Sequence, residues 1–123
     1  QLHTYLKRLI TLRHRLAPLL NPDHPCPHWH GVELNKPDWA SWSHTLAWSL
    51  HGPRGQALLW CGMNAYSKAM HFDLPPSAEG WLRLIDTGLP PGEDLPEQPS
   101  RWEPPGAPLE SRSLMLLVVP GLL

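Results

Sequence analysis

This sequence of 123 residues has little cysteine, no excess of charge of either sign and no long hydrophobic run. Its 10 Lys and Arg residues nearly balance its 11 Asp and Glu residues, so the charge does not predict binding to nucleic acid. The longest apolar run, residues 114–119, is far shorter than the ~20 residues that a membrane helix needs. We therefore expect neither a nucleic acid nor a membrane as a partner.

Cysteine is limited to Cys26 and Cys61, which are too few for a disulfide framework. We expect two reduced thiols in a cytoplasmic protein, with a single disulfide as the less favoured alternative. The N-terminus has no apolar signal-peptide core. Because the sequence has no initiator Met and opens within a helical pattern, we expect the chain to begin inside a longer protein.

Tryptophan and proline are abundant by comparison, with 7 Trp and 16 Pro residues. Disordered segments are poor in aromatic residues, so the tryptophans and the 41% hydrophobic content predict one folded domain with a modest core. The prolines cluster in residues 21–43 and 88–111, which we interpret as long loops around that core.

Residues 2–17 predict an amphipathic helix that ends before Pro18. Its apolar stripe recurs at steps of three and four residues: Leu2, Tyr5, Leu6, Leu9, Leu12 and Leu16. A lone helix of this length is marginal in water, so the stripe must be buried against something. It either folds back on the rest of the chain or pairs with the same helix of a second copy. We expect self-association at high concentration, because the 21–43 linker would let the helix swing free.

Five segments predict β-strands: residues 45–51, 56–63, 68–74, 81–87 and 112–119. In the first of them Leu46, Trp48 and Leu50 alternate with small and polar residues, which suits a half-buried strand. The unbroken apolar run of the last one predicts a central strand covered on both faces. Strands in series, with no helices between them, predict a mainly β fold: an antiparallel β-sandwich preceded by one amphipathic α-helix.

Side chains that could carry chemistry are few. A short loop holds His24, Cys26, His28 and His30, but their alternate spacing matches no zinc pattern, so we expect an exposed polar loop and no metal. The acidic residues lie mostly in predicted loops, and none is marked as half of the carboxylate pair, ~5 Å apart, of a retaining glycosidase. A phosphate loop and a nucleophile elbow are also lacking. We expect no catalysis by this chain alone and no cofactor.

The tryptophans fall into two groups. Trp48, Trp60 and Trp81 lie in predicted strands and are expected in the core. The others lie in predicted loops: Trp29, Trp39, Trp42 and Trp102. A loop tryptophan either plugs an interface or stacks on a sugar ring, and we favour plugs. If the chain binds a glucan, Trp39, Trp42 and Trp102 are the candidate substrate-binding residues.

A series of short motifs runs through the chain in a recognisable order. The helical stretch of residues 5–13 is followed by Trp29-His30-Gly31, Pro37-Asp38-Trp39, and residues 43–48, 58–64, 72–75, 81–87 and 111–114. This order resembles the end of isoamylase-type glycogen debranching enzymes, glycoside hydrolases of the α-amylase superfamily. The chain departs from the family pattern at His44, Trp48 and Met63, where Arg, Phe and Phe are usual.

The resemblance implies that residues 1–20 are the last helix of a catalytic barrel, residues 21–43 a linker and residues 44–123 the C-terminal β-sandwich domain. The family's catalytic carboxylates lie in the barrel, so none carries over to this sequence. The parent enzyme would hydrolyse α-1,6 branch linkages of glycogen or a related α-glucan by the retaining mechanism, without a cofactor. This chain would be a non-catalytic domain that packs on the barrel. The alternative hypotheses for its function are a carbohydrate-binding module that uses the loop tryptophans and an unrelated interaction domain.

Overall fold

The computed structural model of the chain describes residues 2–16, 27–40, 43–52, 54–77, 79–90, 93–96, 99–102 and 106–122. These residues form helix α1 (Leu2–Arg15), a short 3-10 helix η1 (Pro120–Leu122) and a set of β-strands. In chain order the strands are β1 (His28–His30), β2 (Thr45–His51), β3 (Ala57–Asn64), β4 (Met70–Phe72), β5 (Trp81–Asp86), β6 (Ser100–Trp102), β7 (Ala107–Leu109) and β8 (Ser113–Val118).

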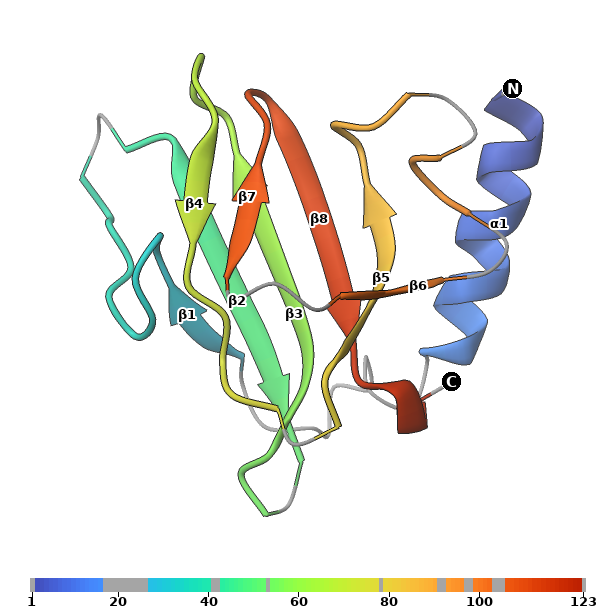
Figure 1. Cartoon of the computed structure of the whole chain (residues 1–123), viewed down its shortest axis with the longest axis horizontal. Helices are drawn as coiled ribbons and strands as arrows, with labels where there is room; N and C mark the ends of the chain where they lie inside the picture. The colour runs from blue at the N-terminus through green and yellow to red at the C-terminus, as the bar shows by residue number, and fades with distance from the viewer. Residues whose placement is uncertain are drawn as a thin grey trace.

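The strands form two antiparallel sheets (Figure 1). The large sheet has the order β1-β2-β3-β8-β5-β6, and the small sheet consists of β4 and β7. β8 pairs with both β3 and β5, which confirms the central position predicted from its apolar run. The predicted fold class, a mainly β antiparallel sandwich preceded by one helix, is confirmed.

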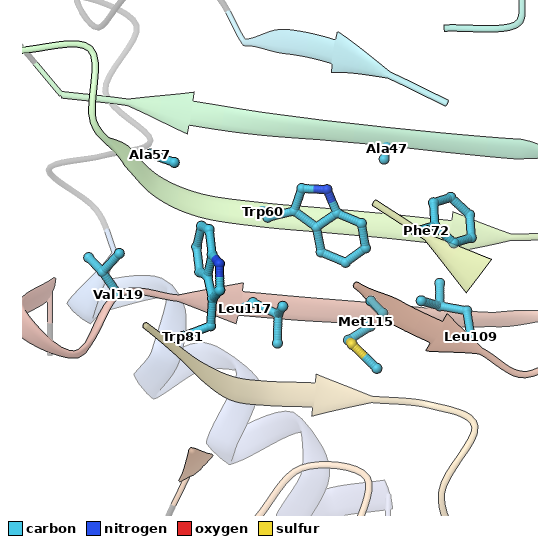
Figure 2. Packing of buried hydrophobic residues seen from close by; sticks show 10 residues of the cluster. Ala47, Ala57, Trp60, Phe72, Trp81, Leu109, Met115, Leu117 and Val119 are labelled. Carbon is cyan, nitrogen blue, oxygen red and sulfur yellow. The ribbon is translucent and has the colours of Figure 1, made fainter. Parts of the chain in front are cut away.

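The main core lies between the two sheets (Figure 2). Trp60 of the large sheet and Phe72 of the small sheet are fully buried and meet edge to face, with ring centroids 6.0 Å apart. The Trp60 indole lies over Gly62, where an added Cβ would collide with it. Ala47 pairs with Gly62, so small residues on β2 and β3 make room for the indole.

This arrangement corrects one expectation about β2. Trp48 was expected in the core, but it is only partly buried, as is Leu50, whereas Ala47 and Ser49 are fully buried between the sheets. The reason is space: the bulk of Trp60 fills the interior at this place, and only small side chains fit beside it. Trp48 therefore lies on the other face of the large sheet. The core positions of Trp60 and Trp81 are confirmed.

Three short strands lie where only loops were expected. β1 falls within the predicted linker and pairs with β2, while β6 and β7 fall within residues 88–111. Each has three residues, too few to give a periodic pattern in the sequence. β7 even contains Pro108, which is tolerated because β7 has its pairing partner, β4, on one side.

Helix α1 packs on the β residues of the same chain. Of the two alternatives for its apolar stripe, this is the one in which the helix folds back on the rest of the chain. Leu16 is buried, and Leu9 and Leu12 pack against a second core cluster that includes Leu84 and Val118. The Arg8 guanidinium also donates a hydrogen bond of 2.9 Å to the carbonyl oxygen of Leu95. The side chains of Leu2 and Tyr5 lie outside the described part. Among the described residues, no helix has the length and apolar character needed to cross a membrane.

Candidate functional site

The main candidate site is the side of the large sheet that faces away from β4 and β7, which we call the open face. Directly paired residues of neighbouring strands point to the same side of a sheet. The pairing register therefore builds one row of side chains across five strands: Trp29, Trp48, Cys61, Leu116 and Ile85. A second row contains Leu46, Met63 and Leu114, and a third contains Leu50, Leu59, Val118 and Leu82.

All the side chains of these three rows are apolar, on the face of an antiparallel sheet that would ordinarily be solvated and polar. Helix α1 packs on the part of this face that β5 and β8 form. Toward β1 the same face stays partly exposed: Trp29 is 42% exposed, and Trp48, Leu46 and Leu114 have intermediate exposure. A contiguous apolar patch of this kind marks an interaction surface. The one sequence signal for it was the apolar run of β8, which predicted cover on both faces.

A basic groove of about 390 Å³ adjoins the open face, between α1 and the residues Leu95, Pro96 and Pro99. Its floor is apolar, with Leu12, Leu84, Leu95 and the prolines beside them, and its rim carries Lys7, Arg8 and Arg15. Helix α1 contains no acidic residue. The helix therefore presents a surface that is complementary to an acidic and apolar partner.

An exposed aromatic pair lies at the β1 margin of the open face. The rings of Trp29 and Trp39 meet edge to face with centroids 5.7 Å apart, and Trp39 is 65% exposed. Trp39 lies within a turn that the Asp38 carboxylate closes by accepting a hydrogen bond of 3.1 Å from the Ala40 amide. Two large aromatic faces held together at a surface can either fill a pocket in a partner or stack on sugar rings.

The structure does not bring the predicted substrate-binding residues together. Trp39 lies beside Trp29 of β1, at one edge of the large sheet. Trp102 lies on β6 at the opposite edge, where it pairs with Trp81, packs on the main core and donates a 2.9 Å hydrogen bond to the Gly106 carbonyl. Trp42 lies outside the described residues. The ring partner of Trp39 is thus Trp29, which was not among the three candidate substrate-binding residues.

The histidine loop differs from the expected exposed loop. His30 is buried, at 3% exposed, and both of its ring nitrogens take part in hydrogen bonds, while His28 is exposed. The cause is strand β1, which carries the His30 side chain against β2. His24 and Cys26 lie outside the described residues. Within the described part, no group of three or more His, Cys, Asp and Glu side chains has the arrangement of a metal site.

Asp86 is the buried carboxylate of the described region. Burial raises its pKa, and the nearby charge of Glu110 adds to this, while the hydrogen bond from the Gly88 amide and the charge of Arg83 oppose it. Its carboxylate accepts the Gly88 bond at 3.0 Å and lies 3.6 Å from an Arg83 nitrogen. These contacts close the turn after β5, so they assign Asp86 a role in the local structure.

Comparison with protein families agrees with this arrangement. The family model for the isoamylase 1-3 C-terminal domain matches residues 28–103, more than half of the chain. The match begins at β1 and leaves out helix α1. A comparison with curated proteins gives no match. The family model covers most of the strands of this β-sandwich. The chain therefore belongs to the isoamylase 1-3 C-terminal domain family.

Proposed function

We propose that this chain is the non-catalytic C-terminal domain of a glycogen debranching enzyme, and that its open face packs on the catalytic barrel of that enzyme. The parent would hydrolyse α-1,6 branch linkages of glycogen or a related α-glucan. The observation that carries the proposal is the continuous apolar surface of the open face, from Trp29 to Ile85. Membership of an isoamylase C-terminal family supplies the partner that would cover it.

The proposed domain limits follow from the sheet. Because β1 pairs with β2, we place the start of the β domain at residue 28, rather than at 44 as the sequence pattern suggested. Helix α1 precedes the family match and keeps Leu6 and Ile10 at 48% and 56% exposure, as expected for the last helix of a barrel. The free thiol of Cys61 is consistent with a reducing cytoplasmic compartment.

The activity of the intact parent enzyme on glycogen tests the claim that the parent cleaves α-1,6 linkages. The intact parent should release linear chains from glycogen with cleavage of α-1,6 linkages, and this chain alone should release no reducing sugar. We expect no activity from the isolated chain because the Asp86 carboxylate is engaged with the Gly88 amide and Arg83 in closing the turn after β5. Sugar release by the pure chain that disappears in Asp86→Asn would overturn the proposal.

The exposed pair Trp29 and Trp39 favours a second candidate, a carbohydrate-binding module. The position of Trp29 in the apolar row makes an interface plug the stronger reading, so we expect α-glucan affinity no tighter than about 1 mM, or about −4 kcal/mol. Calorimetric titration with maltoheptaose measures it. Micromolar binding that Trp39→Ala abolishes, and that Trp102→Ala leaves intact, would reverse the ranking.

A further inference from the structure

Two histidines and a serine form a chain of hydrogen bonds that fastens β1 to the large sheet. The Asn35 amide lies 2.8 Å from Nδ1 of His30, and Nε2 of His30 lies 2.7 Å from the Ser49 hydroxyl oxygen. That oxygen lies 2.8 Å from Nε2 of His51, whose Nδ1 lies 3.1 Å from the Gly55 carbonyl oxygen. Ser49 is fully buried and His30 nearly so.

The donor and the acceptor of each hydrogen bond in this row can be assigned from its two ends, the Asn35 amide and the Gly55 carbonyl. At one end a backbone amide can only donate, so Nδ1 of His30 must accept and its proton sits on Nε2, which donates to Ser49. At the other end a carbonyl can only accept, so Nδ1 of His51 carries the proton and its Nε2 accepts from the Ser49 hydroxyl. Both arguments give one consistent pattern, in which both rings are neutral and have opposite tautomers.

An added proton breaks this pattern at either ring. A proton on Nδ1 of His30 would oppose the Asn35 amide, and two donors cannot share a hydrogen bond. A proton on Nε2 of His51 would leave the buried Ser49 hydroxyl without its acceptor. Asn35 lies in the turn after β1, with a left-handed φ of 60°.

The neighbouring histidine rings act in the same direction. His28 stacks on His51 with ring centroids 4.0 Å apart. Burial lowers the pKa of His30, and the charges of His28 and His51 lower it further. The other charged groups on neighbouring elements are Glu33 and Lys36, which pair with each other at 3.1 Å in the turn after β1, Arg54 in the turn after β2, and Asp73, whose amide donates to the Val32 carbonyl.

We propose that the His30–Ser49–His51 hydrogen-bond chain is an acid-sensitive latch, which holds β1 on the large sheet while His30 is neutral and releases it when His30 gains a proton. The sign follows from linkage: the lowered pKa of His30 means that the open form binds more protons, so the latch is complete above the ordinary pKa of 6.5 and weakens as the pH falls below it. Since β1 carries Trp29, release would remove one end of the open face. This last consequence alone rests on the proposed function.

Hydrogen exchange followed by NMR tests the latch on the isolated chain, without the catalytic domain of the parent enzyme. Protection of the backbone amides that join β1 to β2, corrected for intrinsic exchange, should fall below pH 6.5 by up to about tenfold per pH unit for one linked proton. The double variant His30→Gln with His51→Gln offers Ser49 an amide donor and an amide acceptor that do not titrate, so its protection should not depend on pH. His71→Gln, on an exposed histidine of β4, should keep the dependence of the original chain.

The tautomers give a second readout that needs no variant. Nitrogen-15 chemical shifts of the two rings at pH 7.5 should place the His30 proton on Nε2 and the His51 proton on Nδ1. If His51 instead carries its proton on Nε2, or if the double variant retains the pH dependence, the latch is refuted. Because neither readout involves glucan or a catalytic barrel, its failure would leave the proposed function standing.

Discussion

Trp29 of β1 lies directly opposite Trp48 of β2, on the face of the large sheet that the small sheet does not cover. This pair extends the apolar row of Cys61 and Leu116 to the outermost strand. A sheet whose only task was to close its own sandwich would carry polar side chains there. The pair therefore supports the proposal that a partner packs on the part of the open face that helix α1 leaves uncovered.

Asn64 should be important for stability because it joins the two sheets. Its side-chain nitrogen donates to the carbonyls of Lys68, Leu109 and Glu110 at 2.9, 3.3 and 3.0 Å, and the residue is 1% exposed. Asn64→Asp keeps the shape but loses the donor, so we expect a loss of about 3 kcal/mol in the free energy of unfolding, measured with urea.

The exposed change Gln56→Glu provides the matched control, since it also turns an amide into an acid but keeps the oxygen that accepts from the Arg54 amide. It should alter stability by less than about 0.5 kcal/mol. Equal effects of the two changes would contradict the role of Asn64.

Cys61 should be almost unreactive in the folded chain. The residue is 5% exposed within the open-face row, and burial raises its thiol pKa to about 12. At pH 8 the thiolate fraction is then roughly one in 10⁴, so alkylation by iodoacetamide in a Cys26→Ser background should be slowed more than about 10³-fold relative to the unfolded chain. Alkylation of the native chain at the unfolded rate would show that this part of the face opens readily.

Self-association through α1 remains a prediction, now limited to the side of the helix that the β residues leave uncovered. Leu6 and Ile10 lie one turn apart and are 48% and 56% exposed. Sedimentation at high concentration should show a two-fold dimer that Leu6→Glu with Ile10→Glu abolishes. Tyr66→Glu, a similar change at another exposed hydrophobic residue, should leave it intact. A strictly monomeric chain at about millimolar concentration would refute the contact.

Strands with a clear hydrophobic pattern could be predicted from the sequence, whereas the way in which strands pack on one another could not. The apolar run of β8 placed it in the centre of the sheet. The alternation in β2 could not tell which face looks into the sandwich, because that depends on the Trp60 indole filling the space beside Ala47 and Gly62. β1 gave no signal because three residues cannot establish a period.

The candidate sites depended even more on tertiary structure. Trp39 was a candidate from its residue type, but its neighbour Trp29 comes from a strand that the sequence did not predict. His30 and Ser49 are 19 positions apart and meet only through the β1–β2 pairing. Residue type therefore identified single candidates, while the register of the strands determined which of them act together.

Binding between this chain and the catalytic domain of its parent enzyme, prepared without this region, tests the central claim most directly. Leu46→Glu with Leu114→Glu places two charges in the Met63 row of the open face, at side chains that are partly exposed in this chain. His71→Glu places a charge on the outer side of the small sheet and serves as the control. Calorimetry should show at least about a 100-fold loss of affinity, or about 2.7 kcal/mol, for the double variant and no change for the control. Unchanged affinity of a correctly folded double variant, or a greater loss with His71→Glu, would contradict the assignment of the open face as the docking surface.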